Sequence, residues 1–139
     1  MTSATDPPLA AARNISSVMR RIILEAVPQS QMRPPYDQDE RAGDWYTDAN
    51  GDMVIRTTGT DLADDETFLF ALHELIEMRL CLKAGVTQAE VDAFDAAYTG
   101  EGEPGDCEVS PYRQQHRRAC LVEFLVADML GVVGYGTMT

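Results

Sequence analysis

The sequence predicts an α+β domain that is mainly helical, with an N-terminal helix, a small β-hairpin and then three helices. Apolar residues recur at helical spacing in several stretches, turn residues separate two short β-favouring runs, and capping residues stand at the helix ends. The chain has 139 residues, enough for one domain to bury a core without disulfide bonds. We expect residues 1–13 to be a flexible arm and residues 14–139 to form a single domain.

The N-terminal helix is expected from residue 15 to the residue before Pro28. Its apolar positions follow i, i+3, i+4, i+7 spacing, and proline at position 28 cannot continue a helix. Residues 28–43 hold three prolines and many charges, which is typical of a connecting loop. The apolar stripe consists of Ile15, Val18, Met19, Ile22, Ile23 and Ala26.

The hairpin is predicted from residues 45–47 and 54–58, which are rich in aromatic and β-branched side chains. Between them stands Asp-Ala-Asn-Gly, in which Gly51 is free to take a positive φ. Two short strands are marginal alone, so we expect the hairpin to lie against helices.

Capping residues delimit the three later helices. The first of these helices begins with carboxylates in its first turn and ends at Gly85. The next helix begins with the TQAE capping box. Ser110 followed by Pro111 is a start signal for the last helix, and Gly131 ends it. The expected helices cover residues 64–83, 87–98 and 110–130.

The charge of the chain restricts its partners. Asp and Glu number 23 against 11 Lys and Arg, which gives a net charge of −12. Such a surface repels phosphates and anionic lipids, so we expect no nucleic-acid or membrane partner and favour a peptide or protein with basic groups. The chain has no apolar run of eighteen residues, its N-terminal residues have no long apolar stretch, and its odd number of cysteines shows no CxxC spacing. We therefore expect no membrane span and no signal peptide. These features predict a cytoplasmic protein.

Each of the two histidines falls on an apolar helix face together with a glutamate. At 100° per residue, His73 and Glu77 share one direction among apolar neighbours. His116 and Glu123 lie in the middle of the apolar side of the last helix, next to small residues that would let another helix approach. Buried polar groups need partners, and one divalent metal would satisfy all four. The sequence therefore predicts a metal site between the second and last helices, with His73, Glu77 and His116 as ligands.

Other interpretations stay open. A lone histidine on an apolar face is more often an ordinary core residue, and His73 with Glu77 can be a simple i, i+4 pair. His116 and Glu123 can bond to arginines or to the backbone. Asp95, beside the apolar stripe of the third helix, is a candidate ligand or a carboxylate that orients a ligating histidine, as Glu123 also is. A solvated residue at the rim is the alternative for Asp95.

The stretch FLFALHELIEMRL resembles the metal-binding helix of zincin-type metallopeptidases, in which an HExxH helix supplies two ligands and a general base. The predicted order of helix, hairpin and metal helix also resembles minimal zincins. This resemblance implies that His73 is the first ligand and Glu74 the general base. The sequence departs from the pattern at position 77, where glutamate replaces histidine. Glutamate also binds zinc, and a set of two histidines and one carboxylate suits Zn, Fe or Mn.

The chain from about residue 45 to its end also resembles small proteins of bacteriophages and prophages, which would place it in the cytoplasm of a bacterial host. Two functions follow. One is a metal-dependent hydrolase acting on a peptide or amide, with Glu74 taking a proton from water and strand 53–58 holding an extended substrate. The alternative is a non-enzymatic phage-type binding protein whose metal or polar cluster is structural. A metal phosphohydrolase is a weaker third, because the HD pair typical of that class is missing.

Overall fold

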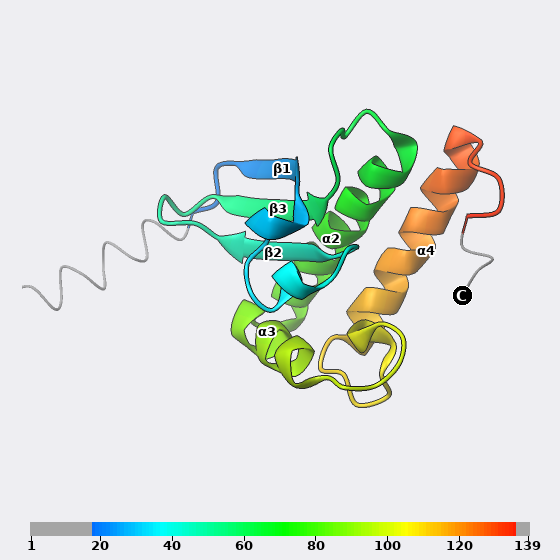
Figure 1. The fold of residues 1–139 in the computed structure, drawn as a ribbon. Coiled ribbons are helices and arrows are strands. Elements are labelled where there is room, and N and C mark those ends of the chain that lie inside the picture. Colours follow the sequence, from blue (N-terminus) through cyan, green and yellow to red (C-terminus); the bar gives the residue numbers. More distant parts are fainter. Residues whose placement is uncertain (1–17, 136–139) are drawn as a thin grey trace, which may run out of the picture.

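The computed structural model describes residues 18–135, which form a three-stranded sheet followed by three α-helices (Figure 1). The α+β class is therefore confirmed. The expected arm, residues 1–13, and the first residues of the expected N-terminal helix lie outside the described residues. Among the described helices, none is both long and apolar enough to cross a membrane.

The sheet consists of β1 (Ile22–Val27), β2 (Gly43–Thr47) and β3 (Met53–Thr58) in the order β1-β3-β2. Strands β2 and β3 are antiparallel and form the predicted hairpin, whereas β1 runs parallel to β3. Because β3 is paired on both sides, it has no free edge for a substrate. The expectation that residues 53–58 hold an extended substrate is therefore wrong.

The predicted N-terminal helix is also wrong over the described residues, since residues 22–27 form β1. All six of these residues pair in register with β3, from Ile22 opposite Met53 to Val27 opposite Thr58. The run begins with two β-branched isoleucines, which suit a strand, and this long-range pairing outweighs the local helical periodicity. Arg21 also secures the start of β1, because its Nη2 lies 2.8 Å from Asp52 Oδ2.

Helix α2 (Asp65–Ala84) has the bounds that its caps predict. The Asp64 side chain accepts a hydrogen bond from the Thr67 backbone N–H at 3.0 Å, and Gly85 ends the helix with φ 78°. In Figure 1, α2 lies between the sheet and α4 (Arg113–Leu130), so two of its sides are covered. Leu69 and Cys81 are accordingly fully buried.

The remaining helices follow the prediction closely. Helix α3 (Gln88–Ala97) has the expected capping box between Thr87 and Glu90. Helix α4 ends at Leu130 with Gly131 as its cap, but it starts at Arg113, after Ser110-Pro111, and Tyr112 is the residue at its N-cap. Tyr112 is buried, and its hydroxyl donates a hydrogen bond to Asp95. Three short 3-10 turns complete the structure: η1 (Gln29–Gln31), η2 (Tyr36–Gln38) and η3 (Pro104–Asp106).

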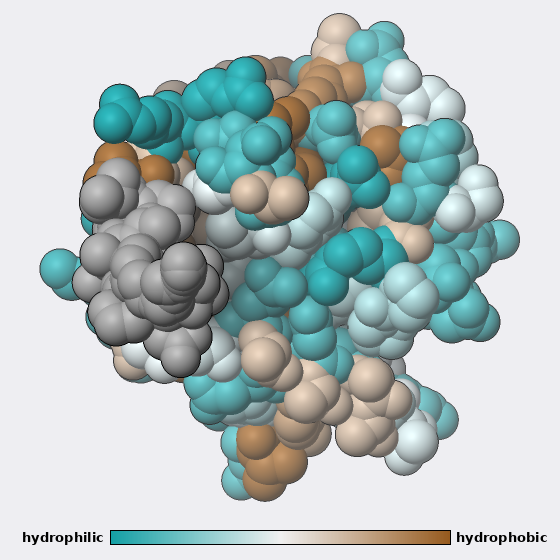
Figure 2. Space-filling model, turned by 90° about the vertical axis from the view of Figure 1, so that its left-hand side faces the viewer, coloured by the Kyte–Doolittle hydropathy of each residue, from teal (hydrophilic) through white to brown (hydrophobic). Residues whose placement is uncertain are grey.

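Two packing interfaces, one on each side of α2, position the site. The main core lies between the sheet and α2 and includes Trp45, Ile55 and Met78. On its other side α2 packs against α4, where small buried residues such as Ala119 and Ala127 allow close approach. The face on the sheet side is mostly hydrophilic, with small groups of hydrophobic residues (Figure 2). The polar residues of interest lie at the seam between α2 and α4.

Candidate metal centre

Four ionisable side chains meet where α2 passes α4. His73 and Glu77 lie one turn apart on α2, and His116 and Glu123 lie two turns apart on α4. All four are buried, with exposed fractions between 3% and 7%. The structure thus brings together both histidines and both glutamates from the two predicted helix faces.

Three atoms of this group form a tight triangle. His73 Nε2 lies 3.2 Å from Glu77 Oε2 and 3.2 Å from His116 Nδ1, and the last two atoms are 3.0 Å apart. Tetrahedral zinc with bonds of about 2.0–2.1 Å to nitrogen or oxygen would hold its ligand atoms roughly 3.3 Å apart. The spacing of the triangle is close to that of three ligands of one ion.

The outer nitrogen of each histidine faces a carboxylate. His73 Nδ1 lies 2.8 Å from Glu123 Oε1, and the Tyr135 hydroxyl donates to the other oxygen of Glu123. His116 Nε2 lies 3.5 Å from Asp106 Oδ1. A carboxylate at one ring nitrogen favours the proton there and leaves the other nitrogen with its lone pair. Two lone pairs and a carboxylate oxygen then face one another, an arrangement that fits a cation.

Without an ion, protons take the place of the cation. Burial alone would lower the pKa of His116, but hydrogen bonds with Cys120 and Glu77 outweigh it and raise that pKa to about 10. Burial alone would raise the pKa of Glu77, but hydrogen bonds with His116 and His73 lower it to about 2. Metal ligands must lose such protons, so binding of an ion at this point would release protons.

Overlapping donor sets surround the triangle. In each of three sets the donor atoms lie within 4.8 Å of one another: His73, His116 and Cys120; His73, Glu74 and Glu77; and Glu103, Asp106 and His116. Every set contains at least one of the two histidines, so they are the centre of the polar cluster. The triangle of His73, His116 and Glu77 has separations of 3.0–3.2 Å.

Cys120 also belongs to this cluster, although Cys120 is not among the metal ligands that the sequence predicts. Its Sγ lies 3.6 Å from His116 Nε2, one turn earlier on α4. Burial on its own would raise the pKa of the thiol, but His116 and His73 lower it. The i, i+4 spacing from His116 is the sequence feature from which this contact could have been predicted.

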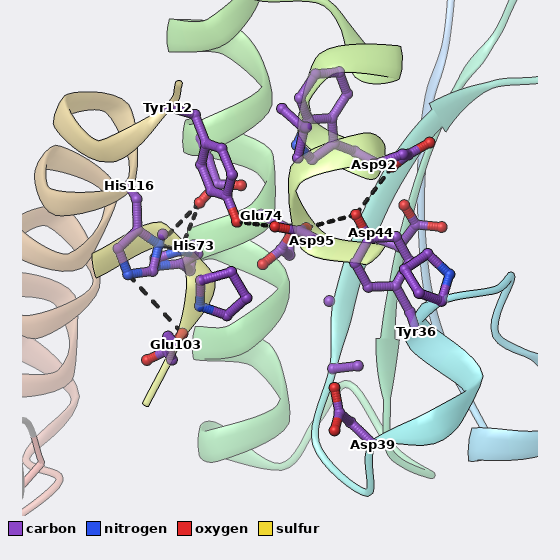
Figure 3. A pocket seen from close by; sticks show the side chains of 18 of the residues that line it. Tyr36, Asp39, Asp44, His73, Glu74, Asp92, Asp95, Glu103, Tyr112 and His116 are labelled. Carbon is purple, nitrogen blue, oxygen red and sulfur yellow. Dashed lines mark hydrogen bonds and ion pairs between the residues drawn. The ribbon is translucent and has the colours of Figure 1, made fainter. Parts of the chain in front are cut away.

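A cleft of about 290 Å³ opens beside the triangle. Figure 3 shows its two walls, with His73 and His116 on the helical side and Tyr36, Asp39 and Asp44 on the other. The lining is strongly acidic, which suits a cation or a basic ligand. Its carboxylates are Asp39, Asp44, Glu74, Glu77, Asp92, Asp95 and Glu103.

Glu74 lies at the wall of this cleft, next to strand β2. A Cβ added to Gly43 would meet the Cδ and Oε2 atoms of Glu74 at 2.4 Å, so the glycine allows the strand to pass directly over the carboxylate. Within residues 18–135, no side chain donates a hydrogen bond to Glu74. Burial and the nearby charge of Glu77 raise the pKa of Glu74 well above its usual range. Glu74 is therefore a carboxylate beside the triangle that accepts no hydrogen bond from a described side chain.

Asp95 has different neighbours from those expected. It accepts a hydrogen bond from the Tyr112 hydroxyl at 2.5 Å, and its other oxygen lies 2.7 Å from the Tyr36 hydroxyl. It therefore contacts two tyrosines and does not orient a histidine. The Tyr36 hydroxyl also lies 2.9 Å from Asp92, and one hydroxyl proton cannot serve two carboxylates. Burial, Glu77 and Asp92 raise the pKa of Asp95 to about 6, although both tyrosine hydrogen bonds act to lower it.

Gly105 of η3 covers His116. A Cβ at this position would lie 2.4 Å from Cγ and 2.6 Å from Nδ1 of the imidazole. Gly105 does not have a positive φ, so its role is close approach to the ring.

Comparisons with protein-family models, with curated proteins and with solved structures found no match to this chain.

Proposed function

We propose that this protein is a metal-dependent hydrolase with a zincin-like site, which holds one divalent ion, Zn or else Fe or Mn, on His73, Glu77 and His116. The observation that carries this proposal is the triangle of three donor atoms at 3.0–3.2 Å, placed beside a cleft. Structural zinc sites use four protein ligands, whereas catalytic sites use three and leave one position open. Three ligand atoms next to a cleft correspond to the catalytic kind.

Glu74 is the proposed general base. It follows His73 directly on α2, lines the cleft and has a carboxylate within 4.8 Å of the donor atoms of His73 and Glu77. A bound ion would supply Lewis acidity toward a carbonyl oxygen of the substrate. The Glu74 carboxylate would accept a proton from water and return it to the leaving amine.

The proposed substrate is a peptide or amide. Gly43 and Trp45 of β2 line the cleft, and β2 pairs with β3 along one side only. An extended chain beside β2 would therefore lie next to the triangle. The acidic lining favours basic residues in that chain.

The test of this function is the substitution Glu74→Gln in protein made without an affinity-histidine tag and loaded with Zn²⁺. We expect the variant to bind one ion per chain as wild type does and to lose about 10²-fold or more of the turnover of a fluorogenic peptide or amide found in a screen. Glu108→Gln is the matched control, because this glutamate is exposed and does not line the cleft. Wild-type turnover by Glu74→Gln would exclude the proposed base.

A non-enzymatic binding protein with a structural metal is the other outcome of the same experiment. It would be supported if wild type holds one ion per chain, turns over no substrate in a broad screen and captures a stoichiometric protein partner. In that case chelation should release the partner, because the ion holds α2 against α4.

A further inference from the structure

The outer face of α4 carries an apolar stripe that nothing in the described structure covers. Leu121, Leu125 and Met129 are 68%, 61% and 74% exposed and follow one another at intervals of four residues. The opposite face of α4 holds the buried residues, among them His116 and Ala119. Figure 1 shows α4 on the side of the molecule away from the sheet. Single exposed apolar residues are common, but a row of three on one helix face is typical of an interaction surface.

Two charged residues lie along one edge of this stripe. Arg117 and Asp128 are eleven residues apart, which at 100° per residue places them within about 20° on the same edge. Both are exposed. Within the described part of the chain, neither side chain forms an ion pair with another residue. One end of the stripe is therefore basic and the other acidic.

This pattern is complementary to itself. In an antiparallel pair of helices related by a two-fold axis, each edge meets the same edge of the other copy. A register centred near residue 123 places Leu121 opposite Leu125 of the second copy, because the two positions are equally far from the centre. The same register places Arg117 opposite Met129 of the second copy, one residue from Asp128, which lies on the same edge and within reach of the long arginine side chain. Apolar contacts in the middle and opposite charges at the edge thus form together.

A surface hollow at the basic end fits the same arrangement. It is lined by Gln114, Arg117, Arg118 and Leu121 among others. In the proposed register these residues face Met129 of the second copy, an adaptable apolar side chain that can fill an irregular space. The local charge of this face is basic near the hollow, where Arg117 and Arg118 lie, in contrast to the net charge of −12 of the whole chain.

We propose that the outer face of α4 is a homodimer interface in which two copies of α4 pack antiparallel through Leu121, Leu125 and Met129, with Arg117 of each copy paired to Asp128 of the other. The partner is a second copy of this chain, because the apolar and charged positions match under one two-fold operation. This interface lies on the face of α4 opposite the metal site and does not depend on the proposed hydrolase activity.

Sedimentation velocity of the full chain over about 1–500 μM tests the proposal. Wild type should dimerise in this range, and Leu125→Arg should weaken dimerisation by at least about 10-fold while keeping the circular dichroism spectrum and melting temperature of wild type. Val109→Arg is the matched control, since Val109 is 77% exposed and lies outside α4. A wild type that stays monomeric throughout, or a dimer that Leu125→Arg leaves intact, would overturn the proposal.

A charge exchange tests the register. Arg117→Asp and Asp128→Arg should each weaken the dimer about 3- to 10-fold, and the protein carrying both substitutions should regain most of the wild-type affinity. If the loss of dimer affinity in the double variant equals the combined losses of the two single variants, the antiparallel register is wrong.

Discussion

The contact between Gly105 and His116 allows a sharp test of the metal site. The substitution Gly105→Ala adds a Cβ that would lie 2.4 Å from Cγ and 2.6 Å from Nδ1 of the imidazole. To lengthen the distance between this Cβ and the ring to an ordinary contact of about 3.4 Å, the ring or η3 must shift by roughly 1 Å. The Nδ1 atom is one corner of the triangle, so a shift of the ring would move a ligand atom out of position.

We expect Gly105→Ala to weaken Zn²⁺ binding by about 10- to 100-fold, or about 1.4–2.8 kcal/mol. Overpacking should also lower the free energy of unfolding of the metal-free protein by about 1–3 kcal/mol. Competition with a chromophoric chelator measures the affinity, and urea unfolding measures the stability. Wild-type affinity in a variant that is destabilised as expected would show that the position of His116 does not matter for the ion and would refute this reasoning.

Gly43→Ala is the matched comparison, because its added Cβ would lie 2.4 Å from the carboxylate of Glu74 and not from a proposed ligand. Neither glycine has a positive φ, so both substitutions act through contact and not through backbone strain. We expect Gly43→Ala to keep its Zn²⁺ affinity within about 3-fold and to lose turnover of whichever substrate the screen finds. Equal loss of Zn²⁺ by both variants would mean that the two glycines act on the fold and not on separate groups.

Three further predictions concern the surroundings of the site. Glu123→Gln should weaken Zn²⁺ binding about 10- to 100-fold, because the Glu123 carboxylate lies 2.8 Å from His73 Nδ1 and keeps the proton on that nitrogen. Isothermal titration measures this affinity, and an unchanged affinity would show that Glu123 does not support the metal site. Metal affinity should rise with pH, since His116 with its pKa of about 10 must lose a proton to bind; an affinity that stays flat between pH 6 and 8 would contradict this. The pKa of Asp95 is raised from 3.8 to about 6, so the folded metal-free protein binds this proton more tightly and its free energy of unfolding should fall as pH rises between these values, by at most about 3 kcal/mol. Asp95→Asn should remove that decline in urea unfolding curves, and an unchanged slope would show that Asp95 titrates normally.

The helices and the hairpin could be predicted because their signals are local. Asp64 and Gly85 bound α2 through side-chain and backbone chemistry within one turn, and the Thr87–Glu90 capping box does the same for α3. The convergence of His73 and His116 could be anticipated because a polar residue on an apolar helix face needs a partner from the facing element. The structure brings these residues together as the helix faces predict.

Strand β1 could not be predicted because its partner is distant in sequence. Residues 22–27 have helical periodicity, and only the parallel pairing with β3 decides their conformation. Because of this pairing, β3 is the central strand of the sheet, and the free edge beside the cleft belongs to β2 and not to β3 as expected. The tyrosine contacts of Asp95 were missed for a similar reason, since Tyr36 lies in a loop that no periodic pattern describes.

The metal centre is tested most directly by X-ray absorption at the zinc edge, on protein made without an affinity-histidine tag and loaded with one Zn²⁺ per chain. We expect two imidazoles and oxygen ligands at about 2.0–2.2 Å and no sulfur, because the ion should lie within the triangle of His73, Glu77 and His116. A zinc–sulfur distance of about 2.3 Å would place the ion with Cys120 instead. Protein that takes up no zinc under these conditions would contradict the metal site altogether.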